Sequence, residues 1–483
     1  MPSHLSSVYH PNFGLLTDLY QLTMAYGYYR QGLHQRRSIF HLFFRKAPFD
    51  GSFAISAGLP LAIDLIRGLK FTADDVQYLG RQLGVDGQPL FNEQFLNYLQ
   101  RLQFSGSIWA IPEGKIVFPH EPILRIEANL LEAQLLETAL LNVINFSTLI
   151  ATKAARIKTA AGSDNTVLEF GLRRAQGIDG ALTASRSAYL GGCDATSNVW
   201  AGRYYGIPIK GTHAHSWVMV FPREIDAFSA YAKALPNNAT LLVDTYNTIE
   251  GTKKAIEVGL ELRKRGHNLL GIRLDSGDLA SLAKQARQLL DNAGFHRTAI
   301  VASNDLDELR IKELKDSGAP ITIWGVGTRL ATAHDQPALG GVYKLAAIQD
   351  ETGQWQPKMK LSEQLIKVSN PGKLQVRRYY NTQNIPIASQ TYNEWLAEPK
   401  AMIKSDNDLI AIPVAHRQED LLVPIFEAGV CNYTPPALAE SRNIALREFR
   451  LFGQQKWTSK NVGLSPSLWD QKNNLWQALS HQS

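Results

Sequence analysis

The stretch GIRLDSGDLASLA, residues 271–283, carries a short apolar run into a polar turn and then into a helical pattern. The apolar run begins at Leu269, contains Arg273 and ends at Asp275. Asp278 follows in the turn. Apolar positions at helical spacing then continue to about residue 293. A buried strand that ends in polar residues and leads into a helix is typical of parallel β/α folds.

The same alternation recurs from about residue 150. Helical patterns at 252–266, 279–293 and 305–317 separate short apolar, β-prone runs. These runs are TVLEF (166–170), TLLVD (240–244), LLGIRLD (269–275), TAIVAS (298–303), ITIWGVG (321–327) and GVYKLAA (341–347). Because they are apolar almost throughout, we expect strands buried on both faces. The pattern predicts an α/β protein with an irregular β/α barrel over 151–350.

The flanking segments predict a second, α+β domain. Helical patterns lie near 16–31 and 72–104, strand-like runs at 38–45, 107–111 and 115–118, and a hairpin around residue 350. The run 129–149 has helical periodicity with Glu and Asn, which indicates a buried helix rather than a membrane span. We expect an N-terminal segment, 1–150, that packs with a C-terminal segment, 351–483.

Composition narrows the class of protein. The 483 residues are 45% hydrophobic and 19% charged, with a net charge of +6 and a pI near 9.0. Lysine and arginine are scattered rather than clustered, which suits small anionic substrates and gives no reason to expect a nucleic-acid partner. Two cysteines and no long apolar stretch predict a cytoplasmic chain with no membrane partner.

Polar residues gather where the predicted barrel strands end. The loops that follow barrel strands converge on one mouth, where active sites form. These groups are Phe170, Arg173 and Arg174; Asp244 and Asn247; Arg273, Asp275 and Asp278; Ser303, Asn304 and Asp305; and Gly325, Gly327 and Thr328. A single terminal Asp or Ser is usually a helix cap, and we assign Asp278 and Asp305 to a cap or to an acid in the first helical turn. The combination of arginines, carboxylates and glycines indicates a site for a phosphorylated substrate.

Each group has a matching chemistry. Backbone N–H groups at Gly325 and Gly327, followed by the hydroxyl of Thr328, can approach phosphate oxygens. Arg173 and Arg273 offer planar donor pairs for a carboxylate or phosphate. Asp244 and Asp275 could hold Mg²⁺ together with substrate phosphates. The sequence contains no P-loop motif.

Two histidines stand in GTHAHSWVM, 211–219, after a probable strand at GIPIK. His215 could serve as a base, a ligand or a phosphoryl acceptor, and a purely structural role stays equally open. His213 is assigned to support. Two histidines at i, i+2 without a third ligand make a poor zinc site.

Taken together, the motifs resemble those of nicotinate phosphoribosyltransferases. The resemblance covers about residues 13 to 378 at least. The matching stretches are LLTDLYQLTMAYGY, FRKAPFDGSFAISAGL, EFGLRRAQG, GTHAHSWV, GIRLDSGDL, IVASND, WGVGTR followed by GGVYKL, and KVSNPGK.

The resemblance implies an ATP-coupled reaction in which nicotinate and phosphoribosyl pyrophosphate give nicotinate mononucleotide and pyrophosphate. It implies that His215 forms a phosphohistidine and that Phe170 and Arg173 hold the pyridine ring. Tyr20 would complete the ring site from a second subunit, so that the active unit would be a homodimer. Arg273 and Asp275 would lie near the pyridine and the ribose.

Among the remaining strand-end groups, Gly325 and Gly327 match the family's loop around the 5′-phosphate. Asp244, Ser303 and Thr328 are expected to bind substrate beside them. We expect Mg²⁺, with Asp275 as a ligand, and ATP as co-substrate.

Several alternatives stay open. In GGCDATSNVWAG, 191–202, Asp194 could mark a preference for nicotinamide, whereas Thr196, Ser197 and Asn198 offer neutral donors that suit a carboxylate. Lys367 and Lys373, around SNPGK, form either a basic clasp or a solvated turn. A nicotinamide or quinolinate phosphoribosyltransferase, a barrel aldolase or isomerase, and a non-catalytic metabolite sensor are the competing functions.

Overall fold

The computed structural model describes residues 12–360, 364, 367–404, 408–412, 415–454, 457 and 461–480. The chain forms two compact units. Unit 1 combines residues 1–148 with 338–483, and unit 2 is the continuous segment 149–337.

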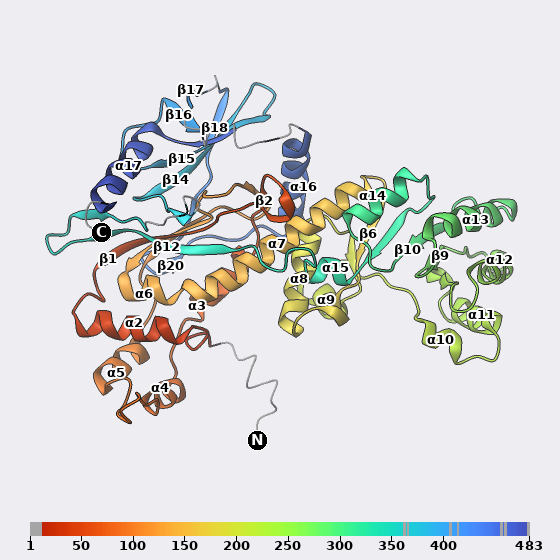
Figure 1. The fold of residues 1–483 in the computed structure, drawn as a ribbon. Helices are drawn as coiled ribbons and strands as arrows, with labels where there is room; N and C mark the ends of the chain where they lie inside the picture. Colours follow the sequence, from red (N-terminus) through yellow and green to blue (C-terminus); the bar gives the residue numbers. More distant parts are fainter. Residues whose placement is uncertain are drawn as a thin grey trace. The chain divides into compact units, whose positions relative to one another are not determined.

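Unit 2 is built on a parallel sheet of six strands, drawn in yellow and green in Figure 1. In spatial order the strands are β7 (Ala195–Thr196), β6 (Thr166–Glu169), β11 (Ile323–Val326), β10 (Ala299–Ala302), β9 (Gly271–Leu274) and β8 (Thr240–Leu242). Five of the six apolar runs expected as barrel strands lie in this sheet. Their central residues are buried, as strands covered on both faces require.

Helices connect these strands, as parallel pairing requires. They are α8 (Ile178–Leu190), α9 (Val199–Tyr205), α10 (His215–Met219), α11 (Glu224–Ala234), α12 (Thr248–Lys264), α13 (Leu279–Asn292), α14 (Glu308–Asp316) and α15 (Thr328–Ala331), with short 3₁₀ turns η2 (Leu172–Arg174) and η3 (Pro236–Asn238). The predicted helices at 252–266, 279–293 and 305–317 correspond to α12, α13 and α14.

Of the expected barrel, the structure shows this open six-stranded sheet. Beyond β7, the segment expected as the strand GIPIK contributes one parallel bridge, between Thr196 and Ile209. Within unit 2, whose residues are all described, no hydrogen-bonded ladder joins β7 to β8. Closure of the barrel therefore stays a prediction.

One strand expected in the barrel was assigned wrongly. The run GVYKLAA at 341–347 belongs to β12 (Gly341–Gln349), which pairs antiparallel with β1 (Arg37–Phe44) in unit 1. Only three of its nine residues are buried, unlike the central parallel strands. An apolar run alone does not reveal which sheet will receive it.

Unit 1 contains the remaining sheets. A seven-stranded antiparallel sheet has the order β13 (Trp355–Pro357), β12, β1, β5 (Leu124–Asn129), β3 (Ser107–Ala110), β19 (Val423–Glu427) and β20 (Val430–Cys431). A six-stranded sheet has the order β17 (Leu409–Ala411), β16 (Ala401–Lys404), β21 (Val462–Leu464), β15 (Pro386–Asn393), β14 (Leu374–Tyr380) and β18 (Arg417–Asp420). A small sheet pairs β2 (Ala54–Ile55) with β4 (Ile116–Val117). Strands from both ends of the chain thus share one sheet.

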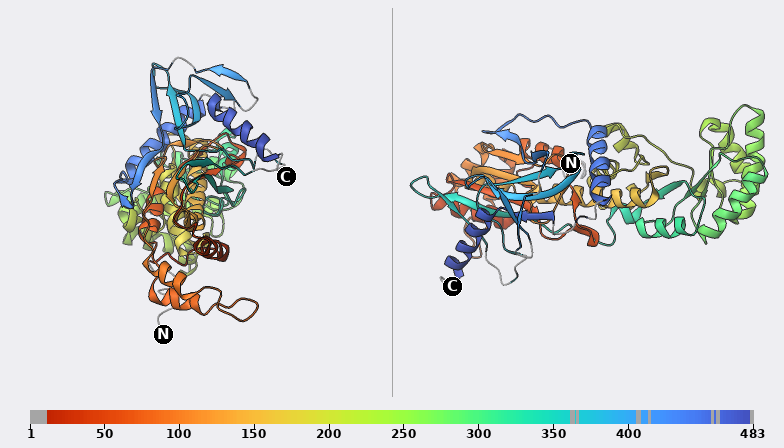
Figure 2. Two further views of the ribbon diagram at one scale, coloured as in Figure 1. Left: turned by 90° about the vertical axis from the view of Figure 1, so that its left-hand side faces the viewer. Right: turned by 90° about the horizontal axis from the view of Figure 1, so that it is seen from above.

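The helices of unit 1 pack on these sheets or on one another. They are α2 (Leu19–Arg30), α3 (Leu59–Arg67), α4 (Ala73–Gly80), α5 (Glu93–Arg101), α6 (Leu130–Leu135), α16 (Leu438–Gln454) and α17 (Pro466–Ser480), with the 3₁₀ turn η1 (Pro48–Asp50). Helix α6 packs against β1 and β5, and α4 packs against α5. The C-terminal helix α17, dark blue in Figures 1 and 2, packs beside β15 and β16. The hairpin expected near residue 350 joins β12 to β13, and Asp350 accepts hydrogen bonds from Thr352 within the turn.

The apolar run 129–149 forms helix, as expected. It is divided between α6 and α7 (Glu137–Ala161), and α7 continues from unit 1 into unit 2. None of the helices in the described part of the chain combines the length and apolar character needed to span a bilayer.

Candidate active site

The centre of the candidate site is Arg273, which leaves β9 next to the end of β10. Its Nε donates to Ser303 Oγ at 2.9 Å, its Nη1 to Thr212 Oγ1 at 3.0 Å and its Nη2 to Asp275 Oδ1 at 3.0 Å. Ser303 also donates a hydrogen bond to Asp275 Oδ1. Three groups from separate loops therefore fix the guanidinium, while Asp275 keeps Oδ2 outside this network.

Asp244, just beyond β8, holds the neighbouring turn. Its Oδ2 accepts from the backbone N–H of Asp275 at 2.7 Å and from Ser276 Oγ at 2.6 Å. Its Oδ1 is buried and has no hydrogen-bond partner among the described residues. A buried carboxylate oxygen without a donor is costly. A cation or a substrate group at this position would satisfy it.

His215 begins α10 and faces both carboxylates. Its Nδ1 lies 3.1 Å from Thr245 Oγ1, and its Nε2 lies 3.8 Å from Asp275 Oδ2 and 4.0 Å from Asp244 Oδ1. The side chain is 41% exposed. Nε2 is therefore accessible beside two acidic groups, a position that suits chemistry better than packing.

His213 has the supporting position assigned to it. Its Nε2 accepts from the backbone N–H of Leu242 at 3.2 Å, and its Nδ1 lies 3.3 Å from the carbonyl of Ala214. Burial lowers the pKa of this ring. The ring stacks edge-on against Tyr231 at a centroid distance of 4.8 Å. These contacts tie the segment before His215 to β8.

Phe170, at the end of β6, provides an apolar wall. The guanidinium carbon of Arg273 lies 5.6 Å from the centre of its ring. A Cβ atom added to Gly325 would stand 2.7 Å from the ring, so only glycine permits this approach of β11. Gly327 caps the short helix α15, which begins at Thr328. The expected Phe170, Arg273, Ser303 and Gly325 thus form one cluster.

Two further predicted site residues are exposed. Arg173 lies in η2, three residues after Phe170, with an exposed side chain and no recorded partner in the described part of the chain. Tyr20 lies in unit 1, where it is 47% exposed. Burial, and then the charge of Glu137, raise the pKa of Tyr20.

The two predicted caps had different outcomes. Asp278 caps α13 and accepts from the backbone N–H groups of Ala280 and Ser281, which confirms the prediction. The assignment of Asp305 was wrong, because Asp307 caps α14 instead and accepts from Arg310 N at 2.8 Å. Asn304 and Asp305 both have positive φ values, and this turn delays the start of the helix.

The segment 191–202 offers less to a substrate than its sequence suggests. Asp194 Oδ2 accepts from Lys158 Nζ and from the backbone of Val167, each at 2.9 Å. Thr196 Oγ1 donates to the buried Glu169, and Asn198 Nδ2 donates to Ser185. Asp194, Thr196 and Asn198 therefore stabilise the fold around β6 and β7.

The SNPGK region also has a structural explanation for one lysine. Lys373 Nζ lies 3.3 Å from Glu127 Oε1 and 3.5 Å from Glu394 Oε2, above the ring of Trp109. Its charge is neutralised within unit 1, so a solvated turn does not describe it.

Sequence reasoning missed three hydroxyls that orient the site. Thr212 holds Arg273, Thr245 holds His215, and Ser276 holds Asp244. Each stands next to a residue that was predicted, but threonine and serine in loops carry no periodic signal. Their adjacency to charged strand-end residues was the one available clue.

A Mg²⁺ ion fits the acidic side of the cluster. Asp244 Oδ1 lacks a donor, and Asp275 Oδ2 lies outside the arginine network. Mg²⁺ commonly uses one or two carboxylates and completes its shell with water and phosphates. In the described part of the chain no group of three or more His, Cys, Asp or Glu side chains is placed to hold a metal alone. Substrate oxygens would therefore have to complete the coordination.

Comparison with known proteins now adds to the geometry. Residues 15–145 match the nicotinate phosphoribosyltransferase N-terminal domain, and residues 166–383 match the nicotinate phosphoribosyltransferase family. A nicotinate phosphoribosyltransferase of Bacillus subtilis is 43% identical, with 95% of this chain and 94% of that protein covered. The human protein of that name is 36% identical, with coverage of 89% and 90%.

Solved structures agree. The crystal structure of human nicotinic acid phosphoribosyltransferase matches with a TM-score of 0.83 at 32% identity, covering 95% of this chain and 99% of that one. A nicotinate-nucleotide pyrophosphorylase from Pyrococcus furiosus matches with a TM-score of 0.70 at 22% identity, covering 91% and 96%, which shows a shared fold. The strand-end cluster and the match over nearly the whole chain lead to one assignment: this chain belongs to the nicotinate phosphoribosyltransferase family.

Proposed function

We propose that the protein transfers a phosphoribosyl group from phosphoribosyl pyrophosphate to nicotinate in NAD biosynthesis, releasing nicotinate mononucleotide and pyrophosphate. The observation that carries this proposal is the cluster of Arg273, Asp275, Ser303 and His215 at the ends of β9, β10 and the adjoining loops, in a member of this family. The family assignment favours this reaction over a barrel aldolase, an isomerase or a metabolite sensor.

The charges suit the transition state of this transfer. The bond from C1 of the ribose to pyrophosphate breaks as the pyridine nitrogen bonds to C1, and positive charge develops on the sugar. Asp275, oriented by Arg273 and by the backbone contact with Asp244, is a fixed negative charge that would stabilise it. Asp244 and Asp275 would hold a Mg²⁺ ion, which would supply positive charge for the departing pyrophosphate.

Nicotinate would lie against Phe170. The ring offers a flat apolar face, and Arg273 beside it can pair with a carboxylate. Arg173 supplies a second guanidinium near this end of β6. The backbone of Gly325 and Gly327 and the hydroxyl of Thr328 would receive the 5′-phosphate.

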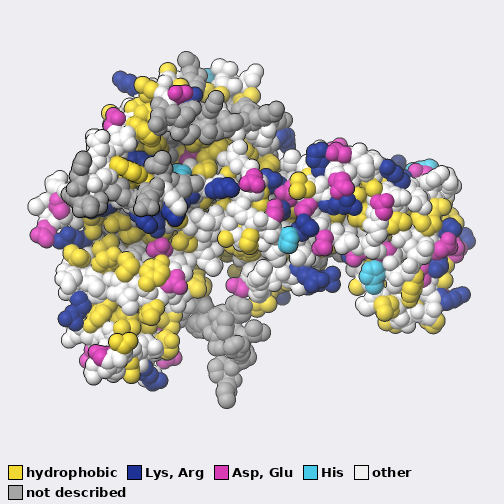
Figure 3. Space-filling view, in the orientation of Figure 1, with side chains coloured by type: hydrophobic (Ala, Val, Ile, Leu, Met, Phe, Trp, Pro, Cys, Tyr) yellow, Lys and Arg dark blue, Asp and Glu magenta, His cyan; other side chains and the backbone are white. Residues whose placement is uncertain are grey.

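A second copy of the chain would supply Tyr20 to the ring site. Leu15, Leu16, Leu19, Tyr20 and Met24 are 38–59% exposed around the start of α2. Figure 3 shows yellow, hydrophobic side chains gathered over the part of unit 1 where α2, α4 and α5 lie. Exposed apolar surface of this kind is typical of a contact face.

Unit 2 has apolar residues of its own for such a homodimer. They are Val199, Trp200, Tyr204, Ile209, Met219, Val220 and Tyr246. We further propose that the sheet of unit 2 belongs to an irregular β/α barrel. We also propose that the reaction takes place in the cytoplasm.

ATP would act through His215. Thr245 engages Nδ1, so Nε2 is the nitrogen available to attack the γ-phosphorus. The N–P bond forms as the bond to the β–γ bridging oxygen breaks, and ADP leaves. Water then hydrolyses the phosphohistidine to inorganic phosphate. The added negative charge beside Asp275 would alter how the mouth holds its anionic ligands.

The test is an assay of pyrophosphate and ADP release with nicotinate, phosphoribosyl pyrophosphate, ATP and Mg²⁺, omitting each in turn. Nicotinate should support pyrophosphate release, and nicotinamide or quinolinate in its place should not. Comparable turnover with quinolinate would contradict the substrate assignment.

The variant His215→Ala tests the phosphohistidine. It should lose ATP hydrolysis and its coupling while slow nucleotide synthesis persists. His296→Ala, which alters an exposed histidine of the same unit, should retain both activities. Normal ATP hydrolysis by His215→Ala would exclude the assigned role.

A further inference from the structure

Unit 1 contains a cavity of about 510 Å³ that the reaction proposed above does not use. Its walls come from the loops after β1 and β4, from β15 and β16, and from β21 and α17. Four cationic residues line it, and no Asp or Glu is among the described lining residues. The cationic residues are Arg45, Lys46, Lys404 and Lys472. An excess of positive charge around a cavity of ligand size favours an anion.

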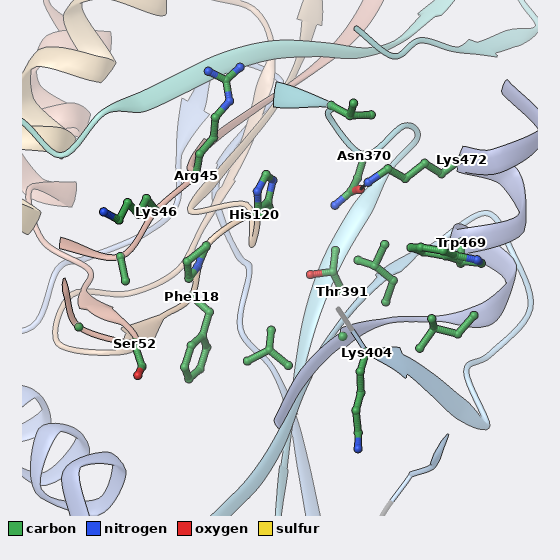
Figure 4. A pocket seen from close by; sticks show the side chains of 18 residues that line it. Arg45, Lys46, Ser52, Phe118, His120, Asn370, Thr391, Lys404, Trp469 and Lys472 are labelled. Atoms are coloured by element: carbon green, nitrogen blue, oxygen red, sulfur yellow. Dashed lines mark hydrogen bonds between the residues drawn. The ribbon is translucent and has the colours of Figure 1, made fainter. Parts of the chain in front are cut away.

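Lys472 is the cation that reaches the interior. Figure 4 shows its side chain extending from α17 to Asn370, and Nζ donates to Asn370 Oδ1 at 2.9 Å. The hydroxyl of Thr391 points toward the middle of the same space. An amine, an amide and a hydroxyl from three different segments therefore line the same cavity.

The polar groups here have unused bonding capacity. Burial lowers the pKa of Lys472 to about 8. Burial and the nearby charges of Lys472 and Arg45 lower the pKa of His120 to about 4, so this ring is neutral at pH 7. Nε of Arg45 is buried without a partner among the described residues. Lys46, in contrast, lies 3.4 Å from Asp50.

The other walls are apolar. Trp469 lies one helical turn before Lys472 on α17, and Phe118 lies across the cavity from it in Figure 4. Val368, Ile403 and Leu464 add to the apolar lining. A ligand in this cavity would have a flat apolar body as well as a charged group.

We propose that this cavity binds a small organic phosphate, with the phosphate at Lys472, Asn370 and Thr391 and an aromatic body against Trp469. Phosphate presents several acceptor oxygens in different directions, which matches three donors from separate segments better than a planar carboxylate does. All lining residues belong to unit 1, so the inference does not rest on the activity proposed for the unit 2 cluster.

The test is calorimetric titration of the full chain with phenyl phosphate, inorganic phosphate and phenol at pH 7. Phenyl phosphate should bind at least about 10-fold more tightly than either part alone, because it combines charge-assisted bonds with apolar burial. Lys472→Met should weaken its binding by about 10-fold or more, whereas Lys472→Arg should retain most of it. Lys70→Gln, an exposed lysine of unit 1, should change nothing.

Further measurements locate the phosphate. Raising the pH from 7 to 9 should weaken binding as Lys472 loses its proton, since a phosphate monoester stays dianionic over this range. Undiminished binding by correctly folded Lys472→Met would overturn the proposal, as would equal affinity for phenol. Arg273→Gln should bind phenyl phosphate as the unchanged chain does. Loss of binding in Arg273→Gln would place the phosphate in unit 2 and overturn the proposal.

Discussion

Arg125 in unit 1 and Arg273 in unit 2 show that the same residue type can either stabilise the fold or bind a substrate. The side chain of Arg125 is 1% exposed and lies between Glu127 and Glu394, with Nε–Oε1 and Nη1–Oε1 distances of 2.9 Å. Its Nη1 also donates to the carbonyl of Leu374 at 2.8 Å. Arg273 is 15% exposed, and two of its three hydrogen-bond partners are hydroxyls.

The partners of each arginine separate structure from function. Arg125 is neutralised by carboxylates from β5 and from the segment after β15, so it joins distant parts of unit 1. Arg273 has a single carboxylate partner, and its other two hydrogen bonds go to the hydroxyls of Ser303 and Thr212. A buried arginine that lies between two carboxylates holds the fold, whereas an arginine oriented by two hydroxyls and one carboxylate at the strand ends is available to a substrate.

The largest effect should follow from breaking the structural member of this pair. Arg125→Met should lower the free energy of unfolding by about 3 kcal/mol, because Glu127 and Glu394 would keep two negative charges in a partly buried site with Lys373 as their remaining partner. Urea unfolding followed by circular dichroism measures it. Arg36→Met, which removes a pair with the exposed Glu351, should cost less than about 1 kcal/mol. Equal losses in the two variants would contradict the comparison.

Asp275, the carboxylate paired with Arg273, should show the reverse pattern. Asp275→Asn should reduce kcat by roughly 10²- to 10³-fold, because the developing charge on the sugar loses its fixed counter-charge, while the unfolding midpoint changes little. Steady-state release of pyrophosphate measures the activity. Asp278→Asn is the matched control, since asparagine also caps helices and Asp278 acts only as a cap. A similar loss of activity in both variants would refute the distinction.

A buried histidine should make the free energy of unfolding depend on pH, whereas an exposed histidine should not. Burial and the charge of Arg125 lower the pKa of His41 to about 3, whereas the unfolded chain takes up the proton near pH 6.5. The stabilising contribution of neutral His41 is thus complete above pH 6.5 and is lost as the pH falls toward 3. It amounts to about 1.4 kcal/mol per pH unit over that window.

Unfolding free energies measured between pH 7 and 4.5 test this linkage. His41→Gln should remove that part of the slope, and His416→Gln, at an exposed position, should leave it unchanged. An identical slope in His41→Gln and the unchanged chain would show that other groups control the acid response.

The smallest effect concerns how closely the strands approach Phe170. Gly325→Ala should raise the KM for nicotinate by roughly 10-fold, because the new Cβ would stand 2.7 Å from the ring and displace it. Gly180→Ala, at a position with no atom near the added Cβ, should leave KM unchanged. An unaltered KM in Gly325→Ala would mean that the ring does not contact nicotinate.

Much of unit 2 was predictable because its signals are local. The apolar runs that became β6, β8, β9, β10 and β11 lie next to their own helices, and the polar residues at their ends identified Arg273, Asp275, Ser303 and Asp244. Asp278 was recognisable as a cap because the helix begins at the next residue. Asp305 was misassigned because a turn with positive φ precedes α14.

The features that were not predictable depend on contacts between residues far apart in the sequence. β12 resembles a barrel strand in isolation, and its partner β1 lies about 300 residues earlier in the chain. The cavity around Lys472 combines segments from 45–52, 118–120, 368–404 and 462–472, and no sequence interval links them. Thr212 and Thr245 became recognisable once Arg273 and His215 had defined positions.

The interrupted path of unit 1 has a consequence for how the protein is made. During synthesis unit 2 emerges as one uninterrupted stretch, whereas β1 must wait for β12, and β3 for β19, to leave the ribosome. Until then the strands of the N-terminal part present open backbone edges, which attract other strands. Nascent chains of this protein therefore depend on completing translation before their largest antiparallel sheet can be protected, and truncated chains that stop near residue 340 would be the most prone to aggregate.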